Sequence, residues 1–177
     1  MLVLIEHMNY KFNFKDMNNL TFRLAKKEEL DNILKLYKNA REEEFCVWND
    51  EYPSQFEIDQ DFNSNNLYVV VLDDEIIGAL SIVEERELDE YNKWIIKDNT
   101  IEMARVVVSK YHHGKNFAKY MVFSAIQICK ERNIKSIHIA CQNENIPAIK
   151  TYKKVGFIFH GEYNIFGHNY YMCEFIL

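Results

Sequence analysis

The hydrophobic residues near the start of the chain recur first with the period of a strand and then with that of a helix. Residues 21–25 alternate in polarity, as a half-buried strand does. Leu30, Ile33, Leu34 and Tyr37 then follow the i, i+3, i+4, i+7 spacing of an apolar helix face. The pattern therefore predicts a strand that leads into a helix of about fifteen residues.

Two further elements are predicted from short local sequence signals, a helix cap and a turn. Ser54 and Glu57 form the S-x-x-E pattern of a capping box, which predicts the start of a short second helix. The apolar runs 67–72 and 75–83, separated by two aspartates, predict a β-hairpin. Gly78 interrupts the second run and indicates a bulge or a close backbone contact there.

The rest of the chain continues to alternate between strands and helices. Residues 84–99 are mostly charged around an apolar island at Trp94 and predict a loop. The later pattern predicts a strand at 101–108, a helix at 115–132, a strand at 136–141, a helix from Asn145 to Gly156, and closing strands at 157–159 and 170–177 joined through 161–169. This order indicates one mixed α/β fold without internal repeats.

Composition narrows the class of protein. With 5 Gly and 2 Pro in 177 residues, and 48% hydrophobic residues, we expect a single domain over residues 1–177 with a sizeable core. The net charge of -6 argues against general binding to nucleic acid or to an anionic membrane. No run approaches the roughly 18 apolar residues of a membrane span, and Met1–Ile5 is too short for a signal peptide. The 4 cysteines form no CxxC pair, so we expect reduced thiols in a cytoplasmic protein.

Two segments carry candidate chemistry. In the first, a strand ending at Val108 runs through a turn with Gly114 into a helix, whose N-terminal N–H groups and positive dipole end suit a phosphate. On residue types alone this signal is weak, because most such helices bind nothing. In the second, Ala148 and Tyr152 share one face of a helix that Asn145 precedes.

The second segment resembles the N-x-x-A-x-x-x-Y-x-K-x-G-F signature of the GNAT superfamily of N-acetyltransferases. All six marked positions match: Asn145, Ala148, Tyr152, Lys154, Gly156 and Phe157. The first segment is similar to the acyl-CoA loop of that family, V-x-P-x-x-R-G-x-G-x-G/A. Val108, Gly114 and Ala118 match, whereas Lys110, His113 and Asn116 replace the family's Pro, Arg and second Gly.

The resemblance implies a fold and a cosubstrate. It implies an α/β fold of the α+β type, with a mixed, mostly antiparallel sheet of about six or seven strands flanked by about four helices. Residues 101–157 would form the acyl-CoA core, and 1–20 an N-terminal extension. Acetyl-CoA would contact the backbone of Val106, Val107 and Val108, the N–H groups of His113, Gly114, Lys115, Asn116, Phe117 and Ala118, and Asn145. Asn116 and His113 would weaken this binding without abolishing it.

The same resemblance suggests an acid and a base. Tyr152 matches the tyrosine that protonates the leaving thiolate, and a phenol with a reference pKa near ~10 is protonated at neutral pH; a tyrosine that merely packs or positions remains the alternative. Glu102 matches a carboxylate that deprotonates the amine, directly or through water. Strand parity puts Glu102 on the face of Val106 and Val108 unless a bulge intervenes, and a solvated or ion-paired Glu102 is equally compatible.

Other side chains carry weaker hypotheses. His138 and Cys141 point to opposite faces of a strand, and His112 and His113 are adjacent with no carboxylate at ligand spacing in the sequence, so no metal is expected. Cys141 is expected to be a buried thiol rather than a nucleophile. The aromatic residues Trp48, Tyr52 and Trp94 either line an acceptor pocket or belong to the core.

The resemblance thus implies an N-acetyltransferase that moves an acetyl group from acetyl-CoA directly to an amine. The acceptor, a small molecule or a peptide, is not specified by the residues. The alternatives are a protein of this fold that binds acyl-CoA or a partner with little or no turnover, and a non-catalytic interaction protein. Dimers are frequent among the proteins that it resembles, which leaves a homodimer open.

Overall fold

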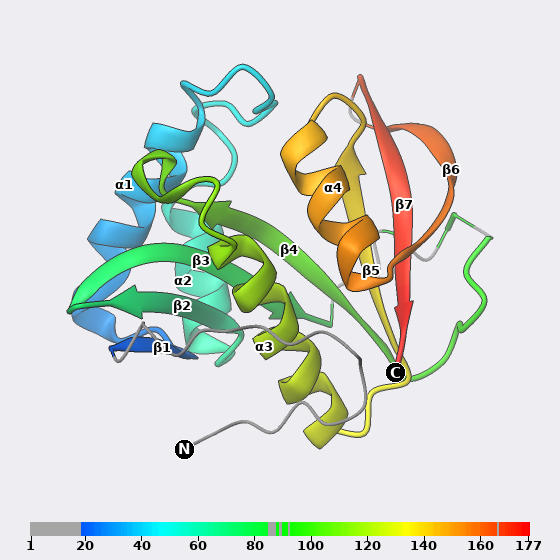
Figure 1. Cartoon of the computed structure of the whole chain (residues 1–177), viewed down its shortest axis with the longest axis horizontal. Helices are drawn as coiled ribbons and strands as arrows, with labels where there is room; N and C mark the ends of the chain where they lie inside the picture. Colours follow the sequence, from blue (N-terminus) through cyan, green and yellow to red (C-terminus); the bar gives the residue numbers. More distant parts are fainter. Residues whose placement is uncertain (1–18, 85–87, 89, 92, 166) are drawn as a thin grey trace.

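A single sheet of seven strands, in the order β1-β2-β3-β4-β5-β7-β6, forms the centre of the molecule (Figure 1). The computed structural model describes residues 19–84, 88, 90, 91, 93–165 and 167–177. Neighbouring strands are antiparallel except β4 and β5, which are parallel. The strands are β1 (Leu20–Leu24), β2 (Leu67–Leu72), β3 (Glu75–Val83), β4 (Thr100–Val108), β5 (Ser136–Gln142), β6 (Ile158–Ile165) and β7 (His168–Ile176).

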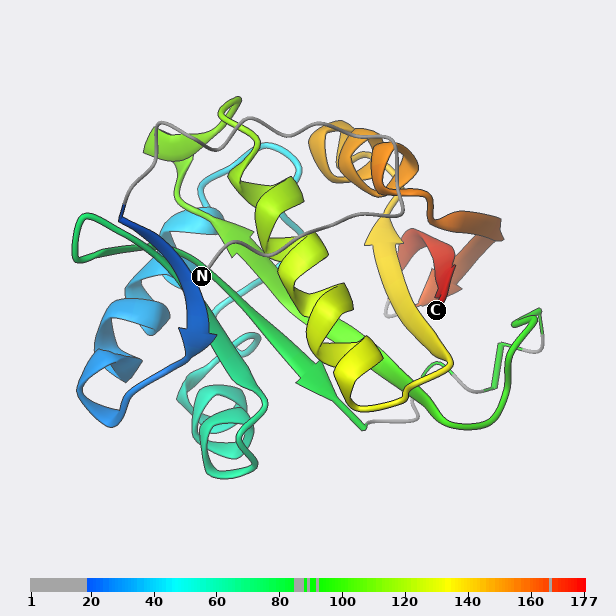
Figure 2. The same ribbon diagram turned by 60° about the horizontal axis from the view of Figure 1, so that its bottom comes forward.

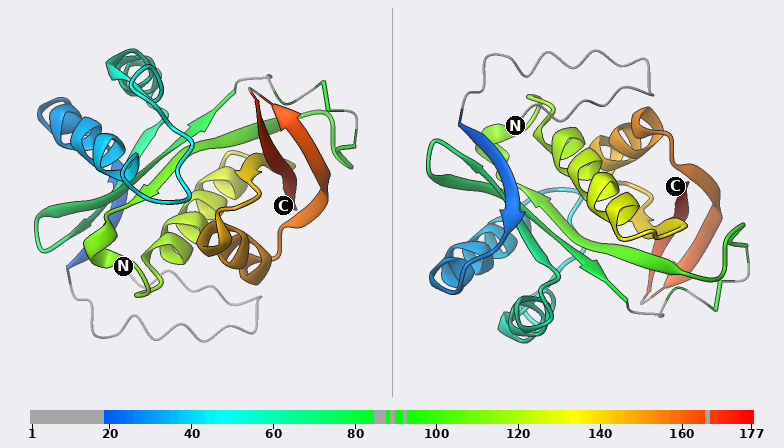
Figure 3. Two further views of the ribbon diagram at one scale, coloured as in Figure 1. Left: turned by 90° about the horizontal axis from the view of Figure 1, so that it is seen from above. Right: turned by 90° about the horizontal axis from the view of Figure 1, so that it is seen from below.

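In the described part of the chain, four α-helices cover the sheet, two on each face. Those on one face are α1 (Leu30–Ala40) and α2 (Gln55–Asn63), and those on the other are α3 (Phe117–Glu131) and α4 (Ile146–Val155). Figures 2 and 3 show the two pairs on opposite sides of the sheet. Short 3-10 turns at Lys27–Glu29 and Lys110–His112 precede α1 and α3. The expected mixed α/β fold is confirmed.

The apolar run of β2 reflects this two-sided cover. Val69 packs into the core under α1 and α2, whereas Val70 packs into the core under α3. Because both faces are buried, successive residues are all apolar and the alternation of a half-exposed strand is lost. Gly78 in β3 is needed for close packing, since a Cβ atom there would lie 2.9 Å from the carbonyl oxygen of Val107.

The parallel strands β4 and β5 part soon after they begin. They pair only from Thr100 opposite Ser136 to Glu102 opposite His138, and beyond that point they diverge (Figure 1). The ladder between β3 and β4 also shifts, at Arg105, whose φ of 54° marks a bulge. The C-terminal half of β4 is therefore free of a β5 partner.

Most predicted elements are confirmed, with changed ends. The capping box at Ser54 is present, with Glu57 accepting from the Ser54 N–H at 2.7 Å. The first helix is shorter than expected, 11 residues after a 3-10 turn. The helix expected at 115–132 begins at Phe117, because the residues before it form the turn. Of the expected extension 1–20, only Asn19 and Leu20 are described, and Leu20 already belongs to β1.

The prediction for the last two strands was wrong in length. Instead of short strands with a long connection at 161–169, β6 and β7 form a hairpin with pairs up to Ile165 opposite His168. Polar residues on the exposed edge strand β6 hide the strand pattern, and Gly161, with a φ of 125°, lies where the ladder is irregular. Among the described residues, no helix is long and apolar enough to cross a membrane.

Candidate active site

The turn between β4 and α3 adopts the backbone form that a phosphate-binding loop needs. Gly114 has a φ of 75° and Asn116, the residue before α3, a φ of 65°. Asparagine enters this left-handed region at lower cost than most residues, which is how the turn forms without the family's second glycine. A Cβ atom on Gly114 would meet nothing within 4 Å, so the space beside it is open to a ligand.

The first turn of α3 presents backbone donors at this loop. The initial N–H groups of a helix have no partner within the helix, and the side chain of Asn116 does not cap them. Residues 113–116 are exposed, while Phe117 is buried with its ring in the core. Lys115 and the other loop residues can therefore offer N–H groups to an anion, whereas the side chain of Phe117 only anchors the helix.

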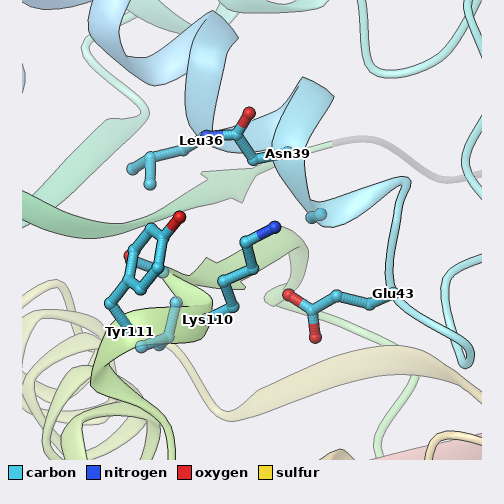
Figure 4. Close-up of a pocket in the computed structure, with 8 residues that line it drawn as sticks. Leu36, Asn39, Glu43, Lys110 and Tyr111 are labelled. Carbon is cyan, nitrogen blue, oxygen red and sulfur yellow. The ribbon is translucent and has the colours of Figure 1, made fainter.

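The side chain of His113, where the family has an arginine, is turned toward β4. Its Nε2 lies 2.9 Å from the carbonyl oxygen of Val108, and its Nδ1 lies 3.8 Å from a carboxylate oxygen of Glu43. Figure 4 shows Glu43 near Lys110 and Tyr111, in a small hollow between the end of α1 and the 3-10 turn. The His113 imidazole therefore contacts Val108, the last residue of β4, and lies near the carboxylate of Glu43.

Tyr152 lies on the inner face of α4, against β5. It is 4% exposed and packs against Phe157, with a ring centroid distance of 5.3 Å. Burial, together with the neighbouring thiols of Cys141 and Cys173, raises the pKa of Tyr152 well above its usual value. Tyr152 is therefore a protonated, buried donor.

The start of α4 is built as its sequence suggested. The side-chain oxygen of Asn145 accepts from the N–H of Ala148 at 3.1 Å, and Pro147 lies in the first turn. Gly156 ends the helix with a φ of 108°. These local contacts fix the position of Tyr152 along the helix.

The thiol of Cys141 is buried, as expected. Burial raises its pKa to about 12, so it is uncharged and unreactive at neutral pH. It faces the core under α4, whereas His138 faces the other side of the sheet and stacks on Trp94 at 3.9 Å. Among the described residues, no three or more His, Cys, Asp or Glu side chains gather into a metal-binding group.

Glu102 does not share a face with Val106 and Val108, because a bulge intervenes between them at Arg105. Before the bulge, Ile101 and Met103 pack under α3, so Glu102 points to the opposite face. The extra residue at Arg105 then reverses the parity, and Val106 and Val108 pack toward α3. The buried Glu102 instead accepts from the N–H of Leu88, in the connection between β3 and β4, at 3.0 Å.

Three aromatic residues considered for an acceptor pocket have different surroundings. Trp48 packs edge-on against Tyr37 in the core under α1, with centroids 5.5 Å apart. Trp94 is buried by its stacking on His138. Tyr52, in the connection between α1 and α2, is 40% exposed, and its hydroxyl accepts from Arg105 at 3.2 Å.

Sequence reasoning missed an ion pair beside this aromatic residue. Arg105 in β4 and Asp61 in α2 are both buried and form a bidentate pair at 2.8 and 2.9 Å. The signal that could have revealed Arg105 is a basic residue inside a mostly apolar strand. Its partner could not be read from the sequence, because the two residues are 44 positions apart.

The family model supplies the class of the protein. The model of the Acetyltransferase (GNAT) family matches residues 32–157, and the chain belongs to that family. The resemblance stated from the sequence is thereby confirmed. The family is one of acetyltransferases.

The match to an individual relative covers less of the chain than the match to the family model. A protein of Bacillus subtilis subsp. natto (strain BEST195), named probable spermine N(1)-acetyltransferase, is 32% identical over 89 residues, which is 50% of this chain and 56% of that protein. The match thus spans little more than half of the relative's length.

Solved structures share the fold over nearly the whole chain. A GNAT acetyltransferase of Streptococcus agalactiae 2603 superposes with a TM-score of 0.76 at 19% identity, over 91% of this chain and 97% of that one. The yncA protein of Salmonella typhimurium, solved with its cofactor acetyl-CoA, gives a TM-score of 0.73 at 18% identity, over 90% and 94% of the chains. At these identities the likeness concerns the fold.

Proposed function

We propose that the protein transfers the acetyl group of acetyl-CoA to an amine by direct attack of the amine on the thioester. The observation that carries the proposal is the position of Tyr152. Its side chain is buried, its raised pKa keeps the phenol protonated, and it neighbours Cys141 on the part of β5 that no longer pairs with β4. A thioester between the parted strands would place its sulfur within reach of this phenol.

The cosubstrate would lie along the unpaired half of β4 and across the turn that follows. The N–H of Ser109 donates to Ile77 of β3, so the polar backbone groups of Val106 and Val108 point to the side that β5 has left. These groups, with Val107 between them, would hold the pantetheine arm. The N–H groups of residues 114–118 would receive the pyrophosphate, since the left-handed turn at Asn116 exposes them, whereas the N–H of His113 donates to the carbonyl oxygen of Lys110.

The chemistry requires one bond to form and one to break. The neutral amine nitrogen attacks the carbonyl carbon, the C–N bond forms, the C–S bond breaks, and the electron pair leaves on sulfur. The Tyr152 hydroxyl donates its proton toward the developing thiolate. Its raised pKa keeps the phenol protonated before the step, which is the form that this role requires.

Glu102 is proposed as the base that takes the proton of the amine through a water molecule. The carboxylate lies at the last paired residue of β4 and β5, next to the point where the strands part. One of its oxygens accepts from Leu88, and a water-mediated route does not require the carboxylate to touch the amine. The side of the sheet that Glu102 faces is also the side of Tyr52 and Arg105, from which the acceptor would approach.

The acceptor class that we favour is a polyamine. The curated relative is named for spermine, and the connection between α1 and α2 is rich in acids that would attract a polycation. Residues 41–51 contain one basic residue, Arg41, and five acidic residues, which are Glu42, Glu43, Glu44, Asp50 and Glu51.

The test measures CoA release with a panel of amines that includes spermine and spermidine, corrected for hydrolysis. We expect Tyr152→Phe to lower kcat about a hundredfold while its Kd for acetyl-CoA stays within about twofold of wild type. Tyr163→Phe, which removes a hydroxyl on β6, is the matched control. Unchanged turnover in Tyr152→Phe would rule out Tyr152 as the acid, and binding without CoA release in the wild type would favour a non-catalytic acyl-CoA-binding protein.

A further inference from the structure

Arg105 is a buried charge that links three parts of the fold to one surface residue. It is 7% exposed, and its Nε and Nη2 donate to the two carboxylate oxygens of Asp61 in α2. Asp61 also accepts from the hydroxyl of Ser81 in β3. The remaining guanidinium nitrogen, Nη1, donates to the hydroxyl of Tyr52 at 3.2 Å. The core network thus extends to Tyr52, a surface residue that is 40% exposed.

Stability alone does not account for this arrangement. A buried ion pair is seldom more stable than apolar residues of similar volume, because both charges lose their hydration. Arg105 also occupies the left-handed backbone region, with a φ of 54°, which costs free energy for a residue with a long side chain. Strained, charged positions of this kind concentrate at functional sites.

The connection around Tyr52 is braced so that the ring is exposed and yet fixed. The side-chain oxygen of Asn49 accepts from the N–H groups of Glu51 and Tyr52 at 2.8 and 3.0 Å. Arg41 donates to the carbonyl oxygen of Pro53 at 2.6 Å. With Arg105 holding its hydroxyl, the Tyr52 side chain is fixed at both ends, beside the bulge of β4.

We propose that Arg105 is a positioning residue that holds Tyr52 as an aromatic wall for a cationic acceptor. This inference rests on the proposed function. An aromatic face attracts an ammonium group or the methylene chain next to it. The guanidinium of Arg105 lies over the Tyr52 ring, with its central carbon 6.0 Å from the centroid, and its two bonds to Asp61 offset its charge, so that a polycation approaching the ring does not meet an uncompensated positive charge.

The experiment uses acetyl-CoA with spermine as the probe, and compares Tyr52→Phe, Arg105→Lys and the double variant with wild type. Arg105→Lys keeps the charge but loses the fork that reaches Asp61 and Tyr52 together. We expect each single variant to raise the KM for spermine about five- to tenfold, with kcat and the Kd for acetyl-CoA within about twofold. The double variant should be no worse than the poorer single one, because both remove the same contact.

Tyr111→Phe is the matched control, because Tyr111 is 75% exposed and removing its hydroxyl leaves the Arg105 network intact. An unchanged KM for spermine in both single variants, or effects that simply multiply in the double variant, would overturn the positioning role. A wild-type protein that binds acetyl-CoA and acetylates none of the amines would instead contradict the proposed function, and the inference with it. Tyr52→Ala, which removes the ring, should raise the KM further than Tyr52→Phe.

Discussion

Asn116 shows how one residue can preserve a loop and still alter what it binds. Its φ of 65° reproduces the backbone of the family's glycine, since asparagine tolerates the left-handed region. Its side chain, however, is exposed at the N-terminus of α3, where a pyrophosphate would approach. The backbone role and the steric role can therefore be separated by mutation.

We expect Asn116→Gly to bind acetyl-CoA more tightly, because the turn is kept and the side chain that crowds the phosphate is removed. Isothermal titration with acetyl-CoA measures the change, which should be a few-fold decrease in Kd. Asn133→Gly is the control, because Asn133 has a φ of 57° at the other end of α3 and is thus the same backbone change far from the loop. Weaker binding in Asn116→Gly would show that the amide contributes a contact to the cosubstrate.

At the scale of elements, Glu174 in β7 joins the connection between β3 and β4 to strands β5 and β6. The carboxylate is fully buried in β7 and accepts from the N–H groups of Ile95 and Ile96, each at 2.9 Å. It also accepts from the Ser136 hydroxyl at 3.0 Å and lies 2.6 Å from Nε2 of His160. Burial would raise the pKa of Glu174, but these four hydrogen bonds outweigh it and the pKa is lowered.

A lowered pKa makes Glu174 a source of stability that acid removes. The contribution is complete above the ordinary carboxyl pKa of about 4.3 and is lost as the pH falls through the lower folded value. We expect Glu174→Gln to be about 1.5–3 kcal/mol less stable than wild type at pH 7. In urea unfolding this difference should shrink steadily from about pH 4 downward.

Glu162→Gln is the control for this experiment, because Glu162 is an exposed carboxylate on β6 with a single side-chain donor, Asn143, at 3.0 Å. It should change stability by less than about 0.5 kcal/mol. If the difference between Glu174→Gln and wild type were constant from pH 7 to pH 3, the ionised form of Glu174 would not be the source of the stability.

At the scale of the whole molecule, a cosubstrate that spans β4, the loop and α4 should stabilise all of them together. At ~100 times its Kd, acetyl-CoA should add about 2.7 kcal/mol to the free energy of unfolding. For a domain of this size that corresponds to a Tm increase of about 5–10 °C. Differential scanning fluorimetry with acetyl-CoA measures it, and AMP at the same concentration is the control.

A Tm that does not move with saturating acetyl-CoA would contradict the cosubstrate site as a whole. A shift of similar size in wild type and in Tyr152→Phe would separate binding from chemistry, because the phenol is proposed to act on the leaving group only. The thermal shift and the CoA-release assay therefore test different parts of the same proposal.

The sequence by itself determined the parts of the protein that depend on near neighbours. The capping box at Ser54, the cap at Asn145 and the turn at Asn116 each involve residues within about four positions of one another, so their signals survive in the order of residues alone. The same is true of the motif that places Tyr152 on α4.

The tertiary structure alone decided where distant segments meet. The bulge at Arg105 turned Glu102 away from the face of Val106, and no local pattern announces a one-residue insertion in a ladder. Likewise, the pairing of β4 with β5, the pair of Arg105 with Asp61 and the hydrogen bond from Ile95 to the buried Glu174 join residues 36 or more positions apart along the chain. Such contacts are set by how the sheet twists and packs, which periodicity does not encode.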